Sequence, residues 1–248
     1  MPGLEPPWQT APEPITLPPD EVHVWRAGLD VGSIALLRLR ETLSADEQAR
    51  AERFYSPVDR ARYLAGRGIL RALLARYLGT RAGDLRFCCN AQGKPALAPG
   101  SGTEDLRFNL SHSQKLALFA FAFRREVGVD LEYVRPSVPD DRLAERFFSP
   151  QEVTRLRALP ESARTEAFFH CWTRKEAYLK ARGEGLGIGL DSFAVSLAPG
   201  QLTDLLIASD DSPEAGRWSL RALAPGDGYV AAIAAEGKDW SLALWQWV

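Results

Sequence analysis

Apolar residues along this chain recur with two different spacings, one typical of strands and one of helices. Helical spacing covers residues 57–79 and returns in the segment that begins at Phe168. A capping box at Ser44 and Glu47 starts another helix ahead of the first of these. A second apolar segment covers residues 34–40. Strand-like runs are predicted at 22–29, 84–90, 106–113, 116–123, 127–134, 192–197, 229–235 and 241–248. The mixture predicts an α+β protein.

Two parts of the chain follow the same order of predicted elements. The sequence "RFYSP" at residues 53–57 recurs as "RFFSP" at 146–150. Each copy precedes a long helical pattern that ends near glycine, at Gly79 and within residues 183–189, and a strand-like run follows. We therefore predict two similar α+β halves related by a pseudo-twofold, with a ligand cleft at their interface.

Composition and charge narrow the class of protein. The chain has 248 residues and a net charge of −2, so it lacks the overall basic character of a nucleic-acid-binding protein. The longest apolar run, residues 116–123, is too short to cross a bilayer. Three cysteines form no disulfide framework, which favours a cytoplasmic location. Residues 1–20 contain seven prolines and are expected to form a flexible leader, not a signal peptide.

Candidate chemistry begins with "GVDLEY" at residues 128–133. In a strand Asp130 and Glu132 point to one face, and their like charges require either water or a cation between them. Some forty residues later, "WTRKEAYLK" places Glu176 and Lys180 one helical turn apart. Lys175 falls inside the apolar stripe of the same helix, which is unusual for an ammonium group.

Each signal has an ordinary explanation when it stands alone. Most D-x-E pairs lie on a solvated strand face, and an i,i+4 Glu–Lys pair contributes only about 0.2–0.5 kcal/mol to a helix. If the helix packs on the strand, however, Glu176 joins Asp130 and Glu132. Three carboxylates without histidines form an oxygen-only site, which suits Mg²⁺ shared with substrate phosphates. The lysines would then face the same phosphates.

Several motifs, in order, resemble the 4′-phosphopantetheinyl transferases of the large tandem, surfactin-synthetase-activating type. They are "QGKP", "FNLSHS", "GVDLE", "RFFSPQE" and "WTRKEAYLKARGEGL". The resemblance extends from about Glu21 to the end of the chain. It implies that coenzyme A and Mg²⁺ bind between two α+β halves. It assigns residues 21–125 to the nucleotide side, and residues 126–248 to the metal and catalytic side.

The resemblance also implies a role for individual residues. The metal ligands fall on Asp130, Glu132 and Glu176, and a family lysine falls on Lys180. The nucleotide-binding positions fall on Arg67, Gly93, Lys94, Pro95, Ser111 and His112. The sequence departs from the family at Glu47, where a lysine is expected, so that Arg50 is the remaining cation of that helix. Without the family, Arg67 and Lys94 read as ordinary exposed cations and His112 as a structural histidine.

The implied reaction is transfer of 4′-phosphopantetheine from coenzyme A to a serine of an acyl, peptidyl or aryl carrier protein, with release of adenosine 3′,5′-bisphosphate. We expect a Mg²⁺-dependent monomer in which Lys180 neutralises phosphate charge and Glu176 takes the serine proton, with Glu152 as the second candidate base. Lys175 is expected either to anchor the structure or to contact phosphate. No nucleic acid or membrane partner is expected.

Two other classes of function remain open at this stage. A coenzyme A pyrophosphatase would also use Mg²⁺ and carboxylates, although the R-E-x-x-E-E helix of the Nudix type is absent from the sequence. A non-catalytic nucleotide-binding or docking module would need neither the carboxylates nor Lys180.

Overall fold

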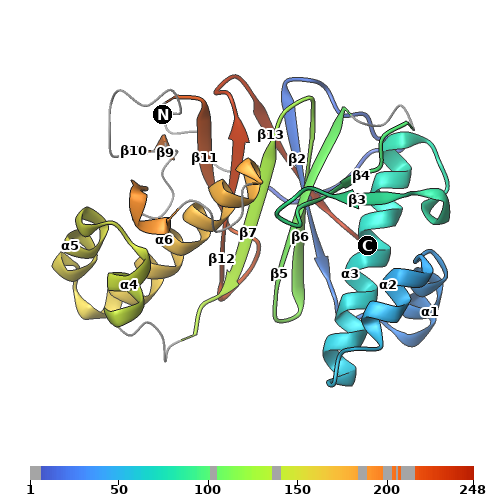
Figure 1. Ribbon diagram of the computed structural model, residues 1–248, viewed down its shortest axis with the longest axis horizontal. Helices are drawn as coiled ribbons and strands as arrows, with labels where there is room; N and C mark the ends of the chain where they lie inside the picture. Colours follow the sequence, from blue (N-terminus) through green and yellow to red (C-terminus); the bar gives the residue numbers. More distant parts are fainter. Residues whose placement is uncertain are drawn as a thin grey trace.

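The computed structural model describes residues 7–100, 105–135, 141–183, 189–197, 203–204, 206–207 and 216–248. The described chain is arranged in four layers (Figure 1). Helix α3 (Pro57–Leu78) lies outside a five-stranded sheet, and helix α6 (Glu161–Arg182) lies outside a four-stranded sheet. The two sheets pack face to face between the helices. The prediction of a mixed α+β fold is confirmed.

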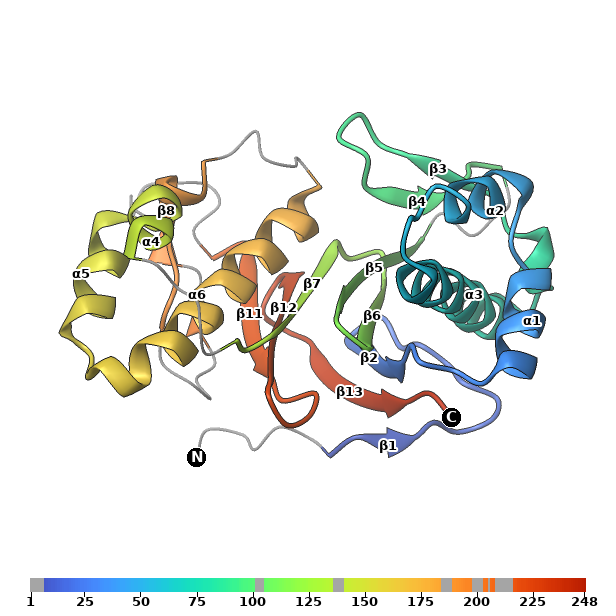
Figure 2. The ribbon, with the colours of Figure 1, turned by 90° about the horizontal axis from the view of Figure 1, so that it is seen from below.

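The five-stranded sheet has the strand order β1-β13-β2-β6-β5. Short helices and a separate hairpin of β3 and β4 surround it on the side of α3 (Figure 2). These elements are β1 (Gln9–Thr10), β2 (Glu21–Gly28), α1 (Ser33–Glu41), α2 (Ala45–Ala51), η1 (Ala82–Asp84), β3 (Phe87–Cys89), β4 (Pro95–Leu97), β5 (Leu106–Ser113) and β6 (Leu116–Phe123). The apolar segment 34–40 is thus helical.

The four-stranded sheet has the order β7-β12-β11-β9, and helix α6 covers its outer face. Helices α4 and α5 lie beyond α6 (Figure 2). The elements are β7 (Val127–Tyr133), α4 (Asp141–Phe147), α5 (Pro150–Ala158), η3 (Leu190–Ser192), β8 (Phe193–Ala194), β9 (Thr203–Asp204), β10 (Leu206–Ile207), β11 (Trp218–Leu223), β12 (Tyr229–Glu236) and β13 (Ser241–Gln246). Strand β10 pairs with β8 outside this sheet.

The two chain termini meet in the five-stranded sheet. Strand β13 pairs in parallel with β2, so the last strand belongs to the sheet built from the first half of the chain. Strand β1 pairs in parallel with β13 in turn. Ile15, in the segment expected to be a flexible leader, is only 8% exposed and packs into the core under α3. Residues 9–15 are therefore held against the sheet, because their apolar side chains find a core to enter.

The sheets meet through small and branched side chains. Alanine and valine residues of β2 and β6 face those of β7 and β12, and nearly all of them are fully buried. On the other side of β7, Gly128 lets the helix approach closely. A Cβ atom there would lie 2.2 Å from both Ala177 O and Ala181 N of α6. The glycine of "GVDLEY" thus allows the backbone of α6 to rest on the strand that carries Asp130 and Glu132.

The two long helices end alike but begin differently. Gly79 and Gly183 both adopt the left-handed conformation that stops a helix, with φ of 62° and 69°. Ser56 of "RFYSP" caps α3 directly. Ser149 of "RFFSP" instead caps the nine-residue helix α5, and α6 begins only after Pro160. The expectation that both copies precede a long helix is wrong for the second copy, because Pro160 forces a new start.

Candidate active site

A pocket of about 300 Å³ brings the predicted motifs together at the side of β5 and α6. Its walls come from the β3–β4 turn, from β5 and from the last turns of α6. The lining residues are Gln92, Gly93, Lys94, Pro95, Asn109, Leu110, Glu176, Leu179, Lys180 and Gly183. The pocket therefore joins "QGKP" to "WTRKEAYLK", which lie some eighty residues apart in the sequence.

Asp130 is the most buried of the three predicted metal ligands, with 4% of its surface exposed. Its Oδ1 accepts hydrogen bonds from Lys180 Nζ (2.6 Å) and Ser111 Oγ (3.0 Å). Lys180 Nζ also donates to Ser111 Oγ (3.0 Å). The other oxygen, Oδ2, is buried without a hydrogen-bond partner. A buried carboxylate oxygen in this state is costly, and an incoming cation would satisfy it.

Glu132 and Glu176 are half-buried beside Asp130. Burial raises the pKa of each above its usual value, and the negative charge of Asp130 raises it further. Lys180 opposes both shifts, and Ser113 opposes that of Glu132 by donating a hydrogen bond to Oε2 (3.1 Å). Within the described part of the chain, no three His, Cys, Asp or Glu side chains already form a metal cage. The carboxylates that repel one another are the hard oxygen donors that suit Mg²⁺.

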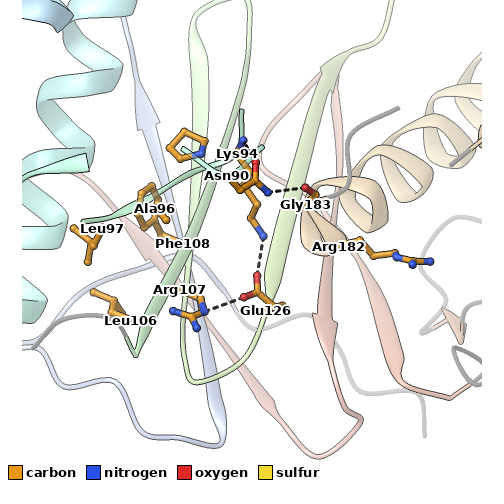
Figure 3. Close-up of a pocket in the computed structure, with 11 residues that line it drawn as sticks. Asn90, Lys94, Ala96, Leu97, Leu106, Arg107, Phe108, Glu126, Arg182 and Gly183 are labelled. Carbon is orange, nitrogen blue, oxygen red and sulfur yellow. Dashed lines mark hydrogen bonds and ion pairs between the residues drawn. The ribbon is translucent and has the colours of Figure 1, made fainter. Parts of the chain in front are cut away.

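Lys94, a predicted nucleotide-binding residue, is engaged inside the protein (Figure 3). Its Nζ donates to Glu126 Oε2 (2.9 Å), Ala181 O (2.9 Å) and Val127 O (3.3 Å). Asn90 Nδ2 donates to Gly183 O (2.6 Å) from the same turn. Burial lowers the pKa of Lys94, against the effect of Glu126. The turn is thus fastened to the end of α6 and the start of β7.

A second pocket of about 320 Å³ lies on the Glu126 side of this lysine (Figure 3). Apolar residues of β4 and β5 form part of its wall, and Arg107 closes it by pairing with Glu126 (2.8 Å). Lys94, Pro95 and Gly183 line both pockets. Lys94 therefore forms part of the partition between them.

The remaining nucleotide-binding candidates lie at different places. Arg67 bonds to Glu47 Oε1 through Nε (2.7 Å) and Nη2 (2.5 Å), and Arg71 Nε donates to Glu47 Oε2 (2.6 Å). Arg50 is exposed on α2, with its guanidinium carbon 5.9 Å from the Tyr63 ring centroid. The Glu47 carboxylate thus occupies the charge of Arg67.

His112 is exposed on β5, beside the buried Ser111 that bonds to Asp130. Neighbouring residues of a strand point to opposite faces, so the imidazole does not share the buried position of the serine. Gly93 has φ of +87°, which a residue with a side chain rarely adopts. The glycine of "QGKP" therefore has a backbone role at the wall of the pocket.

Glu152 and Lys175 are removed from this pocket. Both side chains are fully buried and form an ion pair of 2.7 Å. Glu152 also accepts from Ser149 N (2.8 Å) and Val195 N (2.7 Å), and Lys175 donates to two backbone carbonyls. Glu152 cannot serve as a base, because none of its surface is available to a substrate. Of the two expectations for Lys175, structural anchoring is the one that this geometry supports.

Sequence reasoning missed Asn109 and Ser113, which contact β7 beside the predicted ligands. The signal was present in "FNLSHS", where Asn109, Ser111 and Ser113 alternate on one face of a strand with an apolar surrounding. Polar residues on a buried strand face require partners, which could have pointed to the neighbouring strand.

Comparison with known proteins identifies the family. Residues 126–234 match the family model of the 4′-phosphopantetheinyl transferase superfamily, and residues 33–123 match that of the N-terminal part of 4′-phosphopantetheinyl transferase. The 4′-phosphopantetheinyl transferase HetI of Nostoc sp. is 45% identical over 240 residues, which cover 97% of this chain and 98% of HetI. The 4′-phosphopantetheinyl transferase Sfp of Bacillus subtilis is 30% identical over 202 residues, 82% of this chain and 86% of Sfp.

Among solved structures, the Thermotoga maritima holo-[acyl-carrier-protein] synthase overlaps 46% of this chain and 63% of its own, with 24% identity and a TM-score of 0.36. No helix in the described residues is long and apolar enough to span a membrane. The near full-length match to HetI decides the assignment. The chain belongs to the family of 4′-phosphopantetheinyl transferases.

Proposed function

We propose that the pocket of about 300 Å³ is where this transferase handles coenzyme A. The chain transfers 4′-phosphopantetheine from coenzyme A to a serine of a carrier protein and releases adenosine 3′,5′-bisphosphate. The observation that carries the assignment of the site is the contact of Lys180 with Asp130 and Ser111 beside the "QGKP" turn. It joins the predicted metal, catalytic and nucleotide motifs in one place.

Asp130, Glu132 and Glu176 are the residues that would hold Mg²⁺. The orphaned Oδ2 of Asp130 and the raised pKa values of the two glutamates support this choice, because a divalent cation would relieve both. When bound, the ion supplies charge neutralisation at the diphosphate of coenzyme A. The Asp130 Oδ1 is held by Lys180 and Ser111, so its Oδ2 is the atom left to bind the ion.

Lys180 and Glu176 then perform the chemistry of the chain itself. Lys180, one helical turn beyond Glu176, places its ammonium beside the phosphate oxygens on which negative charge builds. Glu176 is the candidate base for the serine proton, since its raised pKa brings it closer to the working pH of a base. The Gly93–Pro95 turn would form the wall against the nucleotide, and the exposed His112 is placed to meet a phosphate.

We further propose that the protein is built from two halves related by a pseudo-twofold, with this pocket at their interface. The 22-residue helices α3 and α6, each on the outside of a sheet and each ended by a left-handed glycine, support the proposal. Carrier proteins of the acyl, peptidyl or aryl type are the proposed partners. A monomeric state, a cytoplasmic location, and the lack of nucleic acid and membrane partners remain predictions.

One assay separates the proposal from its rivals. Purified protein is incubated with coenzyme A and Mg²⁺, with and without an apo carrier protein, and both carrier mass and coenzyme A are followed. We expect a carrier mass gain of one phosphopantetheine and no loss of coenzyme A without carrier. Consumption without carrier would indicate a pyrophosphatase, and no consumption in either case would indicate a binding module. Asp130→Ala should abolish transfer at saturating Mg²⁺.

A further inference from the structure

Two strand edges lie next to each other beside the proposed metal site. Strand β5 ends the five-stranded sheet, and β7 ends the four-stranded sheet. They run side by side near the centre of the molecule, where the two sheets approach each other (Figure 1). The outward backbone groups of an edge strand need partners when they are buried. Side chains of β5 supply some of those partners to β7.

Three alternate residues of β5 make these contacts. Asn109 Oδ1 accepts a hydrogen bond from Val129 N (2.9 Å), and Ser113 Oγ accepts one from Tyr133 N (3.1 Å). Ser111 Oγ donates to Asp130 Oδ1 between them. All three side chains are 7% exposed. Because alternate residues of a strand share a face, they form one polar row along β7.

The row fixes β7 at two points that enclose the candidate ligands. Val129 and Tyr133 flank Asp130 and Glu132 in the sequence. A strand held at both points cannot slide or rotate without leaving a buried N–H unpaired, which is costly. Ser113 acts twice, since its hydroxyl also donates to Glu132 Oε2 (3.1 Å). The hydroxyl thus couples the backbone of β7 to the orientation of a carboxylate.

We propose that Asn109 and Ser113 are positioning residues, which hold Asp130 and Glu132 so that one cation can reach both. This inference rests on the metal site of the proposed function. It adds residues of the first sheet to a site whose carboxylates all lie on β7 and α6. The site is then shared between the two sheets: one supplies the carboxylates and the other sets their geometry. Partners of this kind around metal ligands typically affect metal affinity strongly.

Ser113→Ala tests the proposal, with Mn²⁺ as the probe and its free concentration followed by electron paramagnetic resonance. We expect Mn²⁺ binding to weaken about 10-fold or more. The Mg²⁺ concentration for half-maximal transfer should rise in parallel, while kcat at saturating Mg²⁺ changes little. Ser113→Thr keeps the hydroxyl and should restore metal affinity. A partly unfolded protein would instead lose kcat in proportion to its lost sites.

Ser219→Ala is the matched control. Ser219 also uses its hydroxyl twice, donating to Gly237 O (2.7 Å) and accepting from Trp240 Nε1 (2.8 Å), but on β11. It should lower the midpoint of thermal unfolding about as much as Ser113→Ala and leave Mn²⁺ binding unchanged. If Ser113→Ala binds Mn²⁺ as tightly as the wild type, or if Ser219→Ala weakens it equally, the positioning role is refuted.

Asn109→Ala provides an independent readout by amide hydrogen exchange. The Val129 amide should exchange faster and Mn²⁺ binding should weaken, whereas an unchanged Val129 amide would contradict the role of Asn109. Failure of the proposed function looks different: a wild-type protein that binds no Mn²⁺ has no metal site to position. That result would overturn both proposals, while normal binding in the variants overturns only this one.

Discussion

Lys180 stands between two roles that a single substitution can separate. Its ammonium already pairs with Asp130, so a purely structural role would cost stability when the charge is lost. Lys180→Met keeps the aliphatic stem and removes the charge. We expect kcat to fall about 10²–10³-fold, the usual effect of removing a group that stabilises transition-state charge. The affinities for coenzyme A and Mg²⁺ should change far less.

Single-turnover rates and calorimetric affinities measure the two effects separately. Lys238→Met, an exposed lysine on the loop before β13, is the control and should leave both unchanged. An unchanged chemical rate in Lys180→Met would reduce Lys180 to a partner of Asp130.

Glu47 provides a residue-scale prediction about stability. Burial would raise its pKa, but Arg67, the Ser44 backbone N–H and Arg71 together lower it below the usual 4.5. Glu47→Gln leaves both arginines without their counter-charge, and removing one partner of a buried pair costs about 3–5 kcal/mol. A carboxylate with a depressed pKa contributes its stability above the unfolded-state pKa and loses it as pH falls. The difference from wild type should therefore shrink below about pH 4.

Urea unfolding at pH 7 and under acid conditions measures this difference. Glu52→Gln is the control, because Glu52 forms an exposed pair with Arg60 and should change stability by less than about 0.5 kcal/mol. A similar loss in both variants would show that the burial of Glu47 contributes nothing special.

At the scale of elements, the β3–β4 turn is fastened to α6 and β7 by Lys94. Lys94→Met should therefore loosen the whole pocket wall and weaken coenzyme A and dephospho-coenzyme A by similar factors. His112→Ala should weaken coenzyme A more, by roughly 1.5–3 kcal/mol, if the imidazole meets the 3′-phosphate. Calorimetry with both ligands distinguishes the two variants. A selective loss in Lys94→Met would instead place its ammonium on the 3′-phosphate.

The contact of α6 with β7 depends on Gly128. Gly128→Ala would press a methyl group against the backbone of α6, so the helix must move away from the strand. We expect a loss of about 1–3 kcal/mol in stability and a fall in kcat/KM, because Glu176 moves away from Asp130 and Glu132. Gly32→Ala meets nothing within 4 Å and should be nearly neutral. Normal turnover in Gly128→Ala would show that the site tolerates a shift of this helix.

For the molecule as a whole, the carboxylate cluster opposes folding until a cation binds. A raised carboxyl pKa means that the folded state binds protons more tightly, so metal-free stability falls as pH rises past about 4.5. Glu176→Gln should therefore raise the metal-free midpoint of thermal unfolding, by about 2–4 °C for each kcal/mol relieved. Mg²⁺ should raise the midpoint of the wild type, and of this variant much less.

Differential scanning fluorimetry with and without Mg²⁺ checks both expectations at once. Glu166→Gln, exposed on the same helix, is the control and should alter neither midpoint. A metal-free Glu176→Gln protein that is no more stable than the wild type would show that the three carboxylates do not repel one another appreciably.

The sequence by itself determined what depends on local spacing and on motif order. The alternation in "GVDLEY", the helical period around Glu176 and Lys180, and the glycines that end the long helices all follow from residues close together in the chain. These signals were sufficient for the α+β class and for the family.

Only the tertiary structure decided which distant residues meet. Lys175 is odd in an apolar stripe until Glu152, 23 positions earlier, is seen to share its burial. Strand β13 joins the sheet of β2, and Lys94 caps a helix from the other half of the chain. Burial makes an unpaired charge or N–H costly, so each such group is fixed by a partner that folding brings near. Periodicity along the chain shows that a partner is required, but the packing of the layers determines which residue it is.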